Sequence, residues 1–201
     1  MRVLTCSVLA AAALAAGAWA EDHHMGPMAP YPDLAHASRA HKGQARTLWR
    51  ATLRSAQQRF ATYSAALAAG YVHWHRDWAR PLVFHLRKGS YNHDGRMLDA
   101  RRPESLVYWW PEHGSPVLLG FMYRVGKGRP PELGGSILHY HRHASYGPWM
   151  THVWLTRSLK TAYARCLPVA ALERAIPAFH YMPPHHGGSG PESAPCSMMM
   201  G

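Results

Sequence analysis

The stretch ESLVYWWPEHGSPVLLGFMYRV, residues 104–125, decides the fold class. Its two halves are rich in β-branched and aromatic residues, which favour β-strands. The residues PEHG between them supply a connection, so the stretch predicts an antiparallel hairpin. Shorter runs of similar character predict further strands at residues 71–75, 81–86, 136–143 and 149–156.

A long amphipathic helix is expected before these strands, over about residues 44–69. Apolar side chains recur there at steps of three and four residues, the spacing of one helix face, and Gly70 is a suitable end. A short helix is predicted at residues 168–176. One long helix followed by several strands predicts an α+β domain, with the helix packed on an antiparallel sheet. The residues of the helix face are Trp49, Leu53, Ala56, Phe60, Tyr63 and Leu67.

Residues 1–20 have the composition of a secretory signal peptide. Arg2 supplies the positive start, an alanine- and leucine-rich run follows, and Ala18 and Ala20 place small residues where signal peptidase cleaves. The run is too short for a membrane anchor, and no later stretch is apolar enough to span a bilayer. We therefore expect cleavage near Ala20 and a periplasmic or secreted protein.

Composition divides the rest of the chain into three parts. Residues 21–43 predict a flexible lead-in, residues 44–180 a single α+β domain, and residues 181–201 a disordered tail rich in His, Pro, Gly and Met. Cys166 and Cys196 remain after cleavage. An oxidising compartment favours a disulfide between them, and a soft metal ligand in the tail is the alternative.

The chain is strongly basic, with 22 Lys and Arg, 11 Asp and Glu and a net charge of +11. A solvated basic surface is the simpler interpretation, and attraction to an acidic envelope polymer is the sharper one. Nucleic acid is not an expected partner, because the chain carries an export signal and its arginines look scattered, without interleaved aromatic residues.

The residues HYHRH, 139–143, place histidines at alternate positions. Alternate side chains of a strand share one face, so His139, His141 and His143 would lie together. His152 belongs to another predicted strand. Imidazole suits zinc, copper, nickel and iron. A His-x-His pair with a histidine from a neighbouring strand therefore predicts a transition-metal site.

A simpler explanation stays open, because the chain has 16 histidines and some fall at alternate positions by chance. The same spacing recurs at His73 and His75. No Gly-x-Ser-x-Gly, phosphate-binding glycine loop, Cys-x-x-Cys or His-Glu-x-x-His motif is present. If the metal site is hydrolytic, Glu132 is the candidate general base, whereas Asp94 and Asp99 have the context of turn residues.

Five motifs together resemble an uncharacterised family of exported bacterial proteins, over about residues 45–156. No activity is established for this family, so the resemblance implies a compartment and a domain boundary rather than a reaction. The motifs are a helix ending in AAGY (68–71), FHL (84–86), DGRMLDARRPESLVY (94–108), Gly-x-x-Tyr (120–123) and THVWL (151–155).

Relatives of that kind tend to carry a His-Glu-His set, whose matching positions here are His85, Met122 and His152. Met122 therefore stands where a carboxylate is expected, which weakens the case for zinc hydrolase chemistry. Thioether with imidazole instead suits copper, especially Cu(I). If Met122 lies on the sheet face away from the helix, a site there would use these three residues and one or more of His139, His141 and His143.

Strand alternation leaves two readings of Met122. If the odd-numbered residues from Val117 to Val125 meet the helix, Met122 lies on the opposite face, which is either open or filled as a second core layer.

The leading expectation is an exported protein that binds copper, or zinc as the alternative cofactor. A metal-dependent hydrolase of envelope or cell-wall material and a non-catalytic binder of acidic envelope polymers are the competing expectations.

Overall fold

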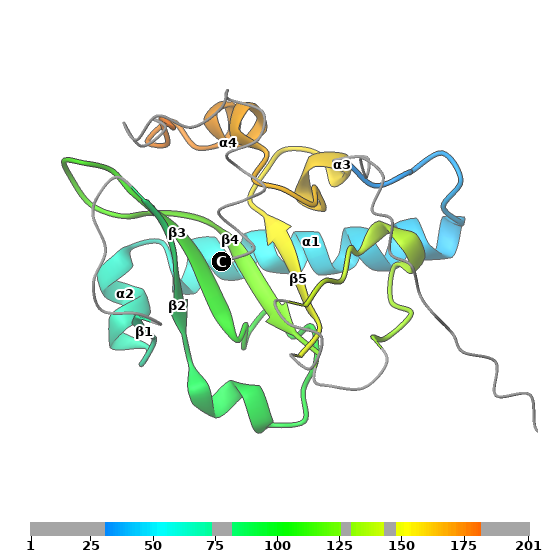
Figure 1. The fold of residues 1–201 in the computed structure, drawn as a ribbon, viewed down its shortest axis with the longest axis horizontal. Helices are drawn as coiled ribbons and strands as arrows, with labels where there is room; N and C mark the ends of the chain where they lie inside the picture. The colour runs from blue at the N-terminus through cyan, green and yellow to red at the C-terminus, as the bar shows by residue number, and fades with distance from the viewer. Residues whose placement is uncertain (1–30, 74–81, 126–129, 143–147, 182–201) are drawn as a thin grey trace, which may run out of the picture.

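The computed structural model (Figure 1) describes residues 31–73, 82–125, 130–142 and 148–181. The expected signal peptide, His75, His143, Cys196 and nearly all of the predicted tail lie outside these residues. Helices α1 (Arg39–Arg59) and α2 (Tyr63–Ala68) come first. The strands that follow are β1 (Val72–His73), β2 (Leu82–Arg87), β3 (Ser105–Trp110), β4 (Val117–Arg124) and β5 (Met150–Trp154). Four short helical elements complete the description: η1 (Gly89–His93), η2 (Gly135–Ile137), α3 (Leu159–Ala162) and α4 (Val169–Ala175).

The strands form one antiparallel sheet in the order β1-β2-β3-β4-β5, so each strand lies beside its sequence neighbour. The predicted hairpin of residues 104–125 is its centre, with Ser105 opposite Met122 and Leu106 opposite Phe121. Figure 1 shows α1 crossing one face of this sheet. The predicted α+β architecture, a long helix on an antiparallel sheet, is confirmed.

The predicted helix over residues 44–69 is in fact two helices. Ser38 caps the start of α1, where its side-chain oxygen accepts the N–H of His41 at 3.0 Å. The Thr62 hydroxyl oxygen accepts the N–H of Ala65 at 3.1 Å and caps α2. This local cap competes with a continuous helix, because it satisfies backbone donors at a new start. Gly70, at φ +84°, ends α2 as predicted.

The core between α1 and the sheet is aromatic. Phe60 is fully buried and meets Phe121 edge to face, with ring centroids 5.6 Å apart. The hydroxyls of Thr52 and Tyr123 are hydrogen-bonded at 2.7 Å, and the Tyr163 hydroxyl donates to the Ala45 carbonyl at 2.8 Å. These bonds satisfy buried polar groups; the first holds α1 to the sheet, and the second holds it to the end of α3.

The opposite face of the sheet is covered as well. Trp109, Met122 and Trp154 are buried there against residues of the C-terminal segment, including Leu172 of α4 and Phe179. The Trp154 indole N–H donates to the carbonyl of Ala164 at 2.9 Å. At Met122 this face is therefore a second core layer and not an open surface.

A β-bulge in β4 overturns part of the predicted alternation. Val107 pairs with Gly120 but Tyr108 pairs with Leu118, so Leu119 is the extra residue. Leu119 consequently packs in the second core with Met122, whereas Phe121 and Tyr123 pack against α1. The odd-numbered residues do not share one face, because a bulge shifts the alternation by one position.

Candidate metal centre

Four of the predicted site histidines lie together on the face of the sheet opposite α1. We call His85 of β2, His152 of β5, and His139 and His141 of the preceding segment the histidine cluster. The ring centroids of His85 and His152 are 5.9 Å apart, those of His152 and His141 are 5.2 Å apart, and those of His141 and His139 are 6.2 Å apart. The fold thus gathers imidazoles that are up to 67 positions apart in the sequence.

The segment around His139 and His141 reaches the cluster without forming the predicted strand over 136–143. Residues 135–137 form η2, which directs Ile137 into the core on the α1 side. His141 and Met150 then form a single antiparallel bridge, with N–H to carbonyl distances of 2.9 and 2.8 Å. The strand prediction was wrong in extent, but this bridge still places the segment beside β5.

Gly120 makes room for the inner part of the cluster. A Cβ atom at this position would lie 2.8 Å from the carbonyl oxygen of Val153 and 2.9 Å from Cε3 of Trp154. The indole therefore lies close over the glycine, and the ring of His152 stacks on the indole at 5.1 Å. A side chain at position 120 would displace both rings.

Met122 is the ladder neighbour of His152 on β4 and is fully buried. It belongs to the second core with Met150 and Trp154, so it fills a core position beside the histidine cluster. A thioether in such a place packs as a hydrophobic group and remains a weak, soft donor.

Burial within the cluster favours the neutral imidazole of His139. His152 is 5% exposed, the other three histidines are half-buried, and the Nε2 atoms of all four are shielded from solvent. Burial, with the nearby positive charge of Arg165, lowers the pKa of His139 to about 4. A neutral ring is the form that coordinates a metal ion.

The rings do not yet form a coordination sphere. Within the described ranges, no three His, Cys, Asp or Glu side chains are arranged to hold one metal ion. His141 is nearly parallel to both His139 and His152, at 10° in each case. Imidazole lone pairs lie in the ring plane, and the planes of stacked parallel rings share no point. Coordination of one ion by all three rings therefore requires at least two of them to rotate.

The candidate general bases Glu132, Asp94 and Asp99 contact groups outside the histidine cluster. Glu132 is exposed and lines a cavity of about 340 Å³ with His41 of α1 and Tyr140. Asp94 accepts the N–H of Arg96, and Asp99 accepts the N–H of Arg101, both at 2.9 Å. Asp94 and Asp99 are therefore turn residues, as predicted.

Sequence reasoning missed Glu104, which lies directly before β3 and is only 2% exposed. Its Oε2 accepts the N–H of Arg124 at 3.2 Å, and burial raises the pKa of its carboxyl to about 7. A charged residue directly before an apolar strand was the available indication.

His73, the described member of the second His-x-His pair, lies apart from the cluster. His73 stacks on Phe84 with ring centroids 5.1 Å apart, and its Nε2 lies 2.5 Å from the hydroxyl of Tyr63. Phe84 belongs to the core on the α1 side, so the half-buried His73 packs against that core. Cys166 is disulfide-bonded, and its partner lies outside the described residues.

Positive charge is concentrated on α1, although the arginines look scattered in the sequence. The helix contains six Lys and Arg residues and no Asp or Glu. Lys42, Arg46, Arg50 and Arg54 follow one another at steps of four residues, which places them along one side of the helix.

In the described part of the chain, no helix is long and apolar enough to cross a membrane.

Comparison with known proteins gave no relatives. No protein-family model matches the chain, and searches of curated proteins and of solved structures found no match.

Proposed function

We propose that this protein is exported and binds a transition-metal ion, copper before zinc, at the histidine cluster, in a role of metal binding or handling. The supporting observation is the convergence of four histidines from three segments on one sheet face, with ring centroids of consecutive members 5.2 to 6.2 Å apart. Export is inferred from residues 1–20.

The choice of copper rests on the groups around these rings. Met122 offers a thioether beside His152, and thioether with imidazole suits Cu(I) better than Zn²⁺. Burial and then the positive charge of Arg165 lower the pKa of His139, and this charge opposes a divalent ion more than a monovalent one. The hydrolase alternative has less support from the two candidate carboxylates. Glu104 accepts the N–H of Arg124, and Glu132 lines a separate cavity with His41 and Tyr140.

A binding role fits the partial burial of the cluster. His85, His139 and His141 are half-buried and His152 is almost fully buried, so an ion would enter past the less buried histidines. Rotation of the stacked rings would then bring their nitrogens to one point. The energy of breaking the stacking is recovered by the metal–nitrogen bonds, so binding and rearrangement are coupled.

The acidic-polymer role is favoured by one separate observation, the uniformly basic α1. Its like charges at steps of four residues repel one another, and a polyanion would relieve that repulsion. Such binding would weaken steeply as salt concentration rises. Retention on immobilised polygalacturonate at low and high salt tests it, and retention that salt does not reduce would contradict it.

The metal proposal is tested by elemental analysis of the mature protein, purified from the envelope without a histidine tag. We expect about one equivalent of copper, which is lost when His139, His141 and His152 are changed to Ala. Changing the exposed His93, His113 and His180 to Ala is the matched control and should leave copper unchanged.

Two results would contradict the proposal. One is copper retained by the cluster variant at the wild-type level. The other is folded wild-type protein that contains no metal and takes up no added copper. Zinc in place of copper, lost in the same variant, would instead favour the hydrolase.

A further inference from the structure

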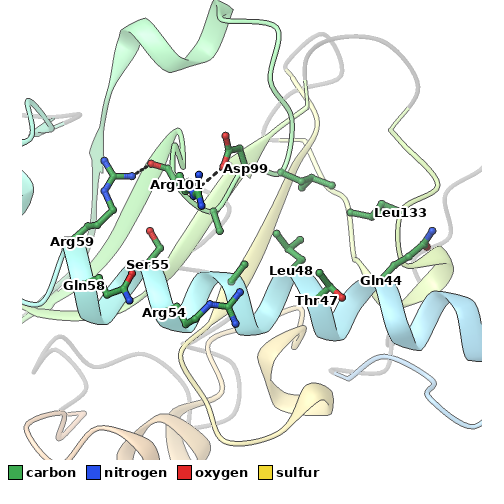
Figure 2. A pocket seen from close by; sticks show the side chains of 13 residues that line it. Gln44, Thr47, Leu48, Arg54, Ser55, Gln58, Arg59, Asp99, Arg101 and Leu133 are labelled. Carbon is green, nitrogen blue, oxygen red and sulfur yellow. Dashed lines mark hydrogen bonds between the residues drawn. The ribbon is translucent and has the colours of Figure 1, made fainter.

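A second candidate site lies on the other side of the sheet from the histidine cluster. A cavity of about 780 Å³ separates α1 from the segment of residues 98–101, and Leu133 closes one end (Figure 2). This volume falls in the range of small-molecule sites, which are about 300–1,000 Å³. The cavity is independent of the proposed metal centre, since none of the four clustered histidines lines it.

The floor of the cavity contains a buried polar group that no described residue satisfies. Ser55 is 5% exposed, and its Oγ has no hydrogen-bond partner among the described residues. Figure 2 shows this side chain directed from α1 toward the segment of residues 98–101. A buried hydroxyl without a partner is unfavourable, so a polar ligand atom would find a ready hydrogen bond here.

The segment of residues 98–101, which faces α1 across the cavity, contains a residue in an unfavourable backbone conformation. Leu98 has φ +57° and is the one non-glycine residue with positive φ in the described chain. A leucine in this region is strained, and such strain is commonly found at ligand sites. Its side chain lines the cavity, together with the apolar surfaces of Leu48, Ala51 and Leu133.

The polar lining is mainly cationic. Arg54, Arg59 and Arg101 line the cavity with a single carboxylate, Asp99. Asp99 already accepts the N–H of Arg101 and a bond from Arg96, and Arg59 donates to the Arg101 carbonyl. The guanidinium groups of Arg54 and Arg101 form no ion pair with a carboxylate in the described ranges, so they are available to an anion.

We propose that this cavity binds a small organic acid with an apolar body. Its carboxylate would pair with Arg54 and Arg101, which suit planar anions. Its apolar part would lie along Leu48 and Ala51, and the Ser55 hydroxyl would hydrogen-bond a polar atom of the ligand. The basic side of α1 continues beyond the cavity and raises the local concentration of such anions.

The test uses the full mature chain and a dansyl-labelled undecanoate as a fluorescent probe. We expect saturable binding of the acid and binding at least about tenfold weaker for its methyl ester, which lacks the charge. The double variant Arg54→Gln, Arg101→Gln should weaken binding of the acid by a similar factor. Arg50→Gln, one turn earlier on α1 and outside the cavity, should change it by less than about twofold.

A variant that fills the cavity separates this site from other apolar surfaces. Ala51→Trp should abolish binding of the probe, while its circular dichroism spectrum should remain that of the folded protein. The proposal is overturned if folded wild-type protein shows no saturable binding, if acid and ester bind equally, or if the double variant binds like wild type. It is also overturned if Arg50→Gln weakens binding as much as the double variant, which would indicate polyanion attraction to the whole helix.

Discussion

The ring of His152 stacks on the indole of Trp154 with centroids 5.1 Å apart and 4° between their planes. The two residues are on the same strand, two positions apart, and the indole occupies the space above Gly120. The position of the most buried cluster histidine therefore depends on a glycine in the neighbouring strand.

Gly120→Ala is expected to destabilise the protein by about 1–3 kcal/mol, the usual cost of overpacking a core. The added Cβ would meet the Val153 backbone at 2.8 Å, and a backbone atom cannot move aside cheaply. Urea denaturation measures the change. Gly43→Ala in α1 is the control, because its Cβ would meet nothing within 4 Å. Alanine there should stabilise the helix by about 0.5–1 kcal/mol.

The Met122→Leu variant distinguishes a role of Met122 as a metal ligand from a role in core packing alone. Leucine preserves the side-chain volume, so the free energy of unfolding should fall by less than about 1.5 kcal/mol. Loss of the thioether should weaken Cu(I) binding by about tenfold or more, since soft ligands select this ion. Competition with bathocuproine disulfonate measures the affinity. Unchanged Cu(I) affinity would make Met122 a packing residue only.

Glu104 makes stability depend on pH. Burial raises the pKa of its carboxyl to about 7 in the folded protein, from a reference value of 4.5. The folded state therefore binds more protons between these values. Its contribution to stability is complete below the lower value and is lost as pH rises through the upper one. The full contribution is on the order of 3 kcal/mol. Asp94 raises this pKa further, whereas Arg124 lowers it.

Glu104→Gln is the variant that tests this pH dependence. A neutral side chain of similar shape should unfold at a higher temperature than wild type near pH 8, and the difference should shrink toward about pH 5. Calorimetry in the presence of a chelator measures both proteins without bound metal. A parallel pH dependence of the two melting temperatures would show that Glu104 does not cause it.

Ser55→Ala removes the buried hydroxyl that lines the cavity against α1. Since this oxygen has no partner among the described residues, its loss should leave the free energy of unfolding unchanged or raise it by up to about 1 kcal/mol. The same variant should weaken binding of the undecanoate probe. Clear destabilisation would mean that the hydroxyl serves the fold rather than a ligand.

The helix face was predicted only in part: Ala56 and Phe60 are buried as expected, but α1 also buries Ala45, Leu48 and Thr52, and Leu67 is exposed. The central hairpin was predictable, because it depends on local periodicity. The break between α1 and α2 was not, because the Thr62 cap competes locally with an apolar pattern that continues past it. The bulge at Leu119 was also hidden, since one inserted residue leaves the composition of a strand unchanged.

The histidine cluster was only partly predictable. The sequence identified His85, His139, His141 and His152 as candidates, but their proximity depends on the register of four strands. His73 shows the limit of spacing as a guide, because its His-x-His pattern matches that of His139 while its ring packs on the α1 side. Long-range pairing, and not local spacing, decides which histidines meet.

The most direct test of copper at the histidine cluster is a Cu(I) titration followed by the imidazole resonances in nuclear magnetic resonance spectra of the mature protein. We predict that the Nε2 or Nδ1 signals of His85, His139, His141 and His152 shift together and saturate at about one equivalent, while those of His73 stay unchanged. Cluster signals that remain unchanged, or shifts shared equally with the exposed His93 and His113, would contradict a copper site at this cluster.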